Sequence, residues 1–198
     1  MPARIAGLSL VGGDPALDFA NTVSWRGADP ADDRLLEPGD LAWWGVHSGL
    51  LPAGEAEAFG SEAEDRERFH EAVALRETIH DVFAALAEGR QPPADALDRL
   101  SRAWARAQGS RRLVAGPEGV RGELVAADPI RRMLARIALA AGDLLLHGDP
   151  ARIKTCAGAE CGYLYLDLSR NRSRRWCDMA ECGNRAKVRR FRAREGDS

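Results

Sequence analysis

The four cysteines of this 198-residue chain all lie between residues 156 and 182, and their spacing constrains this segment more than any other feature. They form two pairs, Cys156 with Cys161 and Cys177 with Cys182, with four residues inside each pair and fifteen between the pairs. Two short loops that each supply two thiolates are typical of tetrahedral zinc sites, with Zn–S distances of about 2.3 Å. The segment is too small to bury a sufficient core, so we expect one structural Zn²⁺ to supply much of its folding energy.

Three other interpretations of the cysteines stay open at this stage. They could form two disulfides, although no secretion signal is present and disulfides are rare in the cytosol. The same four thiolates could hold iron or an iron–sulfur cluster, or the thiols could have no ligand at all. The segment contains no histidine, and four thiolates would leave no open coordination position, which argues against hydrolytic metal catalysis.

The residues around and after the second cysteine pair are strongly basic. Between residues 170 and 194, ten Arg and Lys side chains are opposed only by Asp178 and Glu181. We expect a helix over about 184–194, with Val188 and Phe191 on one edge packed on the zinc module and cations on both flanks. Such a helix could enter a nucleic-acid groove, and a solvated basic tail is the alternative. The candidate nucleic-acid contacts are Arg170, Arg172, Arg174, Arg175, Asn184, Arg185, Lys187, Arg189, Arg190, Arg192 and Arg194.

These residues carry a family resemblance. Residues 182–185 (CGNR) resemble the defining motif of the CGNR zinc-finger family, and residues 169–190 (SRNRSRRWCDMAECGNRAKVRR) resemble its wider signature. Residues 13–22 (GDPALDFANT) are similar to the start of the ABATE domain, the helical domain found upstream in that family. The resemblance implies that the four cysteines bind zinc, that the finger binds DNA, and that the chain is a stress-induced transcription regulator.

The charge distribution supports a division into two domains, a helical sensor or dimerisation domain over residues 1–149 and the zinc finger over 150–198. The last 48 residues carry 12 basic and 6 acidic side chains, a net charge of +6, whereas the first 150 carry 16 and 24, a net charge of −8. This asymmetry indicates a domain that does not bind nucleic acid joined to one that does. It would also allow the acidic domain to mask the basic finger.

Helical periodicity and cap residues predict a mainly α fold with one small β-hairpin in the first domain. The finger should resemble a treble clef or zinc ribbon, with a half-buried strand that places Leu164, Leu166 and Leu168 on one face. We expect residues 8–11 to form a short strand and residues 25–37 a loop. Two predicted helices begin at Pro15 and Asp40, a third spans about 62–88, a fourth begins at Pro93 and a fifth spans 129–147. The predicted hairpin covers 111–126.

Three polar residues fall on apolar helix faces. Asp18 and Asn21 lie on or beside the buried side of the first predicted helix, and Arg76 lies near the middle of the apolar stripe of the longest one. An unpaired buried guanidinium is costly, so we expect Arg76 to pair with Asp18, Glu77 or Asp143. Local hydrogen bonds would explain Asp18 and Asn21, and an ion pair would explain Arg76. The alternatives are a ligand pocket for a small-molecule effector and, for Arg76, an anion-binding role.

The patterns favour regulation over catalysis. We find no repeat, P-loop, dinucleotide fingerprint or nucleophile–base set, and no signal peptide or membrane span, so we expect a cytoplasmic protein that is not an enzyme and does not bind membranes. The predicted function is a zinc-dependent DNA-binding transcription regulator, which could act as a homodimer. The alternatives are an RNA- or ribosome-associated zinc protein, a small-molecule-binding helical domain with a structural finger, and a protein-interaction finger.

Overall fold

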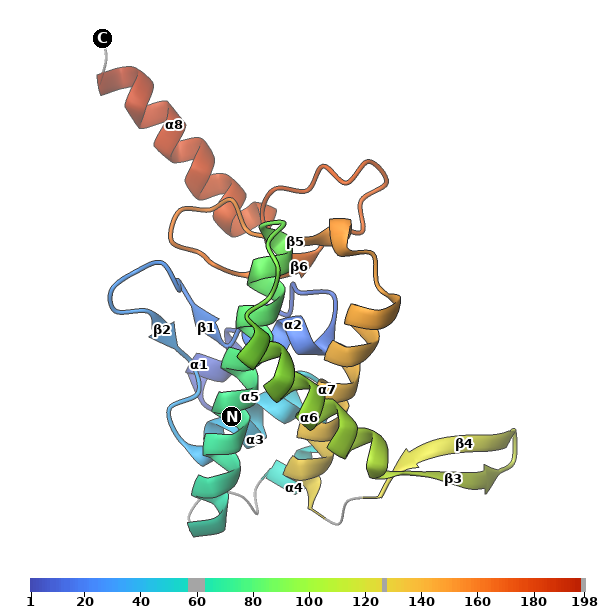
Figure 1. Ribbon diagram of the computed structural model, residues 1–198. Coiled ribbons are helices and arrows are strands. Elements are labelled where there is room, and N and C mark those ends of the chain that lie inside the picture. The colour runs from blue at the N-terminus through green and yellow to red at the C-terminus, as the bar shows by residue number, and fades with distance from the viewer. Residues whose placement is uncertain (57–62, 126–127, 197–198) are drawn as a thin grey trace.

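The computed structural model describes residues 1–56, 63–125 and 128–196 (Figure 1). The helices and helical turns are α1 (Ala3–Ala6), α2 (Pro15–Ala20), α3 (Pro38–His47), α4 (Ala53–Ala56), α5 (Ala63–Ala87), α6 (Ala94–Gly109), α7 (Pro129–His147), η1 (Pro150–Arg152), η2 (Met179–Gly183) and α8 (Asn184–Gly196). The strands are β1 (Val23–Ser24), β2 (Asp32–Asp33), β3 (Arg111–Gly116), β4 (Gly119–Leu124), β5 (Ile153–Thr155) and β6 (Leu164–Leu166). The mainly α fold with small hairpins agrees with the sequence-based prediction.

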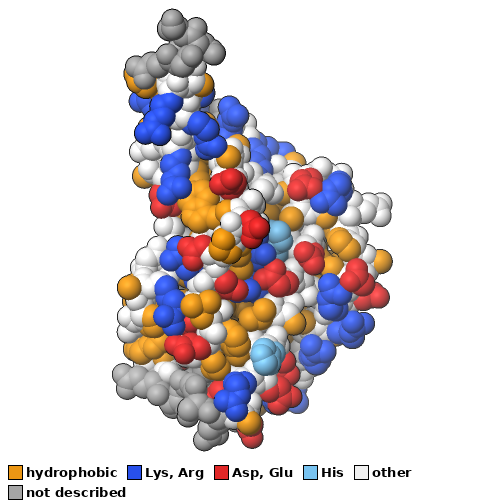
Figure 2. Space-filling view, turned by 90° about the vertical axis from the view of Figure 1, so that its left-hand side faces the viewer, with side chains coloured by type: hydrophobic (Ala, Val, Ile, Leu, Met, Phe, Trp, Pro, Cys, Tyr) orange, Lys and Arg blue, Asp and Glu red, His pale blue; other side chains and the backbone are white. Residues whose placement is uncertain are grey.

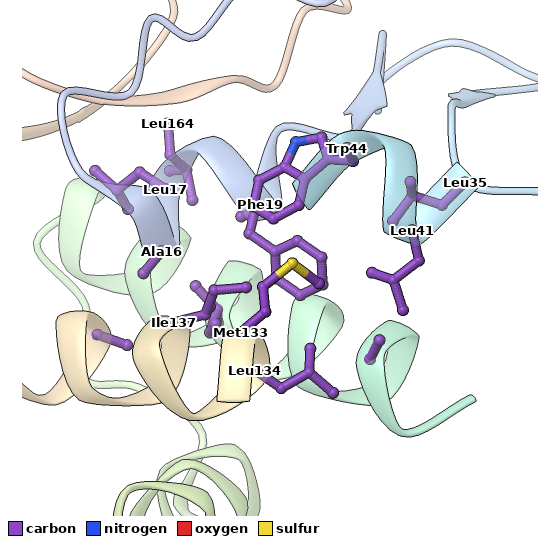
Figure 3. Packing of buried hydrophobic residues seen from close by; sticks show 14 of the residues in the cluster. Ala16, Leu17, Phe19, Leu35, Leu41, Trp44, Met133, Leu134, Ile137 and Leu164 are labelled. Carbon is purple, nitrogen blue, oxygen red and sulfur yellow. The ribbon is translucent and has the colours of Figure 1, made fainter. Parts of the chain in front are cut away.

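The main core lies where α2 and α3 pack against the long helices α5 and α7 (Figures 1 and 3). Phe19 and Trp44 are fully buried there, with their ring centroids 4.9 Å apart and their planes tilted by 48°. Met133 from α7 packs beside them (Figure 3). Trp44 is therefore a core anchor, as paired tryptophans in a helix often are.

Several helix ends form as the sequence predicts. Asp14 accepts the backbone N–H of Ala16, and Asp128 accepts those of Ile130 and Arg131, each with proline at the first helical position. The third helix begins at Pro38, two residues earlier than expected, because Glu37 and Asp40 form a capping box. Residue 62, where the longest helix was expected to begin, lies outside the described residues, and α5 begins at Ala63.

The strands agree only in part with expectation. The predicted hairpin forms as β3–β4 and projects from the end of α6 (Figure 1). Residues 8–11 form no strand. The segment 25–37, predicted as a loop, contains β2, which pairs antiparallel with β1 just before the segment. Two-residue strands of this kind carry too few residues for alternation to reveal them.

The zinc module packs directly on the helical body. Strands β5 and β6 pair antiparallel, with Ile153 opposite Leu166 and Thr155 opposite Leu164, and both contact α5. Ile153 and Leu164 belong to the main hydrophobic core, whereas Tyr163 and Tyr165 pack with the cysteines. The prediction of a half-buried strand was wrong, because β6 lies between two buried layers.

Candidate metal centre and basic surface

The four cysteine sulfurs form one compact, buried cluster. All four Sγ atoms lie within 4.8 Å of one another, and the separations are 3.6 Å for Cys161–Cys177 and 3.7 Å for Cys177–Cys182. Disulfide sulfurs lie about 2.05 Å apart, so these thiols are free. Two sulfurs on one tetrahedral zinc ion with Zn–S bonds of about 2.3 Å would lie about 3.8 Å apart. The donor set therefore fits one zinc ion with no coordination position left for a substrate.

The backbone around the first cysteine pair depends on two glycines. A Cβ atom at residue 158 would lie 3.1 Å from Cys182 Sγ, so a glycine there lets the loop approach the fourth ligand closely. Gly162 has a φ of +69°, a conformation that favours glycine, and a Cβ there would lie 2.8 Å from Arg26 Cβ. These are the tight bends that the glycines of this loop predict.

Hydrogen bonds stabilise negative charge on the first ligand. Hydrogen bonds with the thiols of Cys161 and Cys177 are the largest cause of the lowered pKa of Cys156. The backbone N–H groups of Cys177 (3.2 Å) and Gly158 (3.4 Å) donate to the same sulfur. Zinc binds thiolates and not thiols. The donors favour the ligand form of Cys156, whereas the hydrogen bonds to Cys156, together with burial, raise the pKa of the Cys161 and Cys177 thiols. Burial raises the pKa of Tyr163 and of Tyr165 to about 12, which keeps both neutral beside the cluster.

A segment of the helical body holds the first cysteine loop. Arg26 N–H donates to the carbonyl oxygen of Cys161 (3.3 Å), and Gly27 N–H donates to that of Glu160 (3.0 Å). Trp25 and Trp176 pack partly buried against the cysteine cluster. The role of residues 25–27 was missed because nothing in a polar loop indicates which distant segment it contacts.

A buried carboxylate organises the chain between the two cysteine pairs. Asp167 is fully buried and accepts hydrogen bonds from Lys154 Nζ (2.6 Å) and from the backbone N–H groups of Ser169 and Arg174, both at 3.0 Å. Burial alone would raise its pKa, but the bonds from Lys154 and Ser169 outweigh burial and lower it well below the ordinary value. The alternation of residues 163–168 gives no sign that this carboxylate is buried and fully bonded.

One of the predicted nucleic-acid contacts points into the protein. Arg174 Nε donates to the carbonyl oxygen of Trp176 (3.0 Å), its terminal nitrogens donate to carbonyls of Val11 and Cys177, and its guanidinium lies 4.4 Å from the ring centroid of Tyr165. The prediction that Arg174 contacts phosphate is therefore a poor fit, because its donors are already used. Its neighbour in sequence, Arg175, is exposed.

The other predicted contacts lie on the loop before the third cysteine and on α8, which projects from the body (Figure 1). Blue side chains line this projecting part in Figure 2. The residues whose side chains are exposed are Arg170, Arg172, Arg175, Asn184, Arg185, Lys187, Arg189, Arg190 and Arg192; the side chain of Arg194 lies outside the described part. Arg172 pairs with Asp149 at 2.8 Å, and Asn184 Nδ2 donates to the carbonyl oxygen of Ala180 at 2.9 Å.

The apolar edge of α8 does not pack as expected. Val188 is 49% exposed and Phe191 62% exposed, because the helix leaves the zinc module and does not lie against it. The base of α8 is fixed by the guanidinium of Arg185, which lies 4.3 Å from the ring centroid of Trp25. The helix consequently presents its apolar edge and both basic flanks to the outside.

The three polar residues of the predicted ligand pocket make internal contacts. Asp18 Oδ1 accepts the N–H of Gly12 (2.7 Å), and burial raises its pKa to about 6. Asn21 bonds twice to the backbone of Leu164. These bonds account for the polar side chains on buried faces, and an effector-binding role for them stays a prediction.

Arg76 forms the expected buried ion pair, with one partner that was not expected. It donates through both terminal nitrogens to Asp33, at 2.7 Å each, and through Nε to Glu77 at 2.7 Å. Glu77 was among the predicted partners, whereas Asp18 and Asp143 are not the residues it binds. Asp33 lies on β2, in the segment predicted as a loop.

Comparison with known families agrees with this architecture. Residues 13–148 match the family model ABATE, described as "Putative stress-induced transcription regulator", and residues 152–195 match the model of the CGNR zinc finger. No curated protein matches the chain. The second match identifies the metal of the four-cysteine site as one structural zinc ion. Among the described residues, no helix is long and apolar enough to cross a membrane.

Proposed function

Because the chain belongs to the ABATE family and carries a CGNR zinc finger, we propose that it is a zinc-dependent transcription regulator that binds DNA through α8. In this proposal the zinc ion fixes the base of the helix, and the exposed cations contact phosphates. The helical domain carries the regulatory part, by sensing a ligand or by mediating assembly. Four thiolates leave the zinc ion no open position, so the metal has a structural and not a catalytic role in this proposal.

The observation that carries the proposal is the exposure of α8 together with its charge. Lys187 and Arg190 lie on one flank of the apolar edge, and Arg185, Arg189 and Arg192 lie on the other. No acidic residue lies on α8 between Asn184 and Arg194. A solvated tail would need no fixed starting point. This helix instead follows directly on the helical turn that contains the metal ligand Cys182, and the Arg185–Trp25 contact orients it.

The dimensions and side chains of α8 are compatible with the major groove. Its 13 residues span about 20 Å, and a helix is about 10–12 Å wide with its side chains, close to the width of the groove. Asn184 and Arg185 at the start of the helix could reach base edges. Val188 and Phe191 could contact thymine methyl groups between the two rows of cations.

The first experiment measures binding of the zinc-loaded protein to duplex DNA at several salt concentrations. If α8 and the preceding loop neutralise about four to six phosphates, log K should fall with log salt at a slope of about −4 to −5. A flat salt dependence would contradict the proposal. Duplexes selected from a random pool would then give the preferred sequence.

A pair of variants locates the contact surface. Arg189→Gln with Arg192→Gln should weaken binding strongly and make the salt slope shallower by about two, while zinc content and helicity stay unchanged. The matched control is Arg66→Gln with Arg90→Gln, which removes two exposed arginines from the body. If both double variants bind alike, α8 is not the contact surface.

RNA is the other polymer that a basic zinc module could bind. If a structured RNA and duplex DNA compete equally well for the protein at one salt concentration, the protein is not specific for DNA. Tighter binding to RNA would favour the RNA-associated alternative.

A further inference from the structure

A groove of about 670 Å³ lies between α5, α6 and α7, on the helical body. Each helix contributes residues at the i, i+3, i+4 and i+7 spacing that places side chains on one face. The volume falls within the range of about 300–1,000 Å³ found for small-molecule sites in proteins. The three helices are neighbours in Figure 1.

The floor of the groove is apolar and made of small side chains. Ala103 and Ala107 on α6 face Ala135 and Ala138 on α7, with Leu134 beside them. Larger side chains at these positions would fill the space between the helices, as they do in the main core. The alanines leave the floor of the groove open and apolar.

The rim of the groove is basic. Arg102, Arg106 and Arg131 line it, are exposed, and form no ion pair with any residue that the structure describes. Arg99 also lines it but is paired with Asp95 at 2.5 Å, and Glu71 is the one acidic lining residue among the described ones.

The helical body is not uniformly acidic. Residues 94–147, from the start of α6 to the end of α7, carry nine arginines and six acidic residues, a net charge of +3. Four of these arginines line the groove, whereas Arg111, Arg121, Arg132 and Arg136 line a separate pocket.

We propose that this groove binds an amphiphilic anion, a carboxylate or phosphate that carries an apolar chain. The apolar part lies on the alanine floor, and the charged head lies against the guanidinium groups of Arg102, Arg106 and Arg131. Arginine suits both heads because its planar fork matches carboxylate and phosphate oxygens. The site deepens the regulatory part of the proposed function, yet binding to it needs no DNA, so the two can fail separately.

Calorimetry of the zinc-loaded full chain with decanoate tests the proposal. Decanamide has the same chain without the charge, and acetate has the charge without the chain. Decanoate should bind once per chain, and both other probes should bind at least about tenfold more weakly. Decyl phosphate, tested in parallel, distinguishes a phosphate head from a carboxylate head.

Two sets of variants locate the site. Arg102→Gln with Arg106→Gln should weaken decanoate binding at least about tenfold, because two charge-assisted contacts are lost. Arg66→Gln removes one positive charge from the opposite face of α5, and it should leave the affinity for decanoate within about twofold of the parent's. Ala103→Leu narrows the groove without changing its charge, and it should also weaken the binding of decanoate.

Three results would overturn the proposal. Equal affinity for decanoate and decanamide would remove the role of the arginines. Unchanged affinity in the double arginine variant would place the ligand elsewhere. If neither decanoate nor decyl phosphate binds, the groove is not a site for an amphiphilic anion, and dissociation of a dimer by the double arginine variant in sedimentation experiments would then identify it as an interface between two copies of the chain.

Discussion

The side-chain amide of Asn21 forms two hydrogen bonds with the backbone of Leu164, at the boundary between the helical body and the zinc module. Nδ2 donates to the carbonyl oxygen and Oδ1 accepts the N–H, both at 2.8 Å. Asn21 is 3% exposed and Leu164 is fully buried. One side chain of the body thus replaces a neighbouring strand along the edge of β6, and through β6 it connects the main core to the cysteine cluster.

Replacing Asn21 with alanine should destabilise the fold by about 2–4 kcal/mol. The substitution leaves a buried N–H and a buried carbonyl of Leu164 without partners, and each such group costs about 1–3 kcal/mol. Urea denaturation of the zinc-loaded protein gives the free energy of unfolding. A loss below about 0.5 kcal/mol would mean that water reaches β6 and satisfies both groups.

Removing the metal should unfold the module and also weaken the body. The module has little core besides the cysteine cluster, and its strand β6 contributes Leu164 to the main core. Chelation should release one zinc ion per chain, reduce the ordered structure of residues 156–183 and lower the melting temperature of the whole protein. Elemental analysis, circular dichroism and calorimetry measure these three effects. An unchanged melting temperature would show that the body is independent of the finger.

Two adjacent arginines should differ in their effect on stability. Arg174→Gln should cost about 1–3 kcal/mol, because the guanidinium donates to several carbonyls and stacks on Tyr165. Arg175→Gln should cost less, at most about 1 kcal/mol, since Arg175 is exposed and its guanidinium lies only over the ring of Trp176, 5.2 Å from the centroid. Denaturation of both variants at saturating zinc makes the comparison. Equal losses would contradict the structural role assigned to Arg174.

The metal site could be predicted from the sequence because its ligands are close in the chain. Each cysteine pair spans a short loop, so the spacing brings two thiolates together and favours a tetrahedral zinc site over the alternatives. Helix starts are local in the same sense, because an aspartate followed by proline, as at Asp14 and Asp128, marks the start of a helix without reference to distant residues. Local chemistry of this kind needs no knowledge of the tertiary fold.

The features that were missed depend on distant packing. The alternation of Tyr163–Leu168 shows two faces but does not say that both are covered, one by the body and one by the cysteines. The Arg76–Asp33 pair joins residues 43 positions apart, and a polar loop gives no sign of such a partner. A helical wheel places Val188 and Phe191 on one edge, yet whether that edge is covered depends on the direction in which α8 leaves its base.

The stability of the protein should fall on mild acidification because of His80 on α5. Burial, and then the positive charge of Arg26, lower the pKa of this imidazole from 6.5 to about 4, against the opposing effects of Glu77 and Asp81. In the unfolded chain the imidazole takes up a proton as the pH falls through about 6.5, whereas in the folded chain it stays neutral until about pH 4. The contribution of the neutral His80 imidazole to the free energy of unfolding is therefore complete above pH 6.5. It is lost progressively between pH 6.5 and 4.

Substituting His80 with glutamine should remove this part of the pH dependence. At pH 5 the difference in proton binding by His80 amounts to about 2 kcal/mol, so the loss of stability between pH 7.5 and 5 should be smaller by about 1–2 kcal/mol in the variant. Both proteins share any effect of acid on the zinc site, so the difference between them isolates the imidazole. His70→Gln, on the same helix but exposed, is the control and should follow the parent. Parallel curves for the parent and for His80→Gln would show that the imidazole is protonated as readily in the folded chain as in the unfolded one.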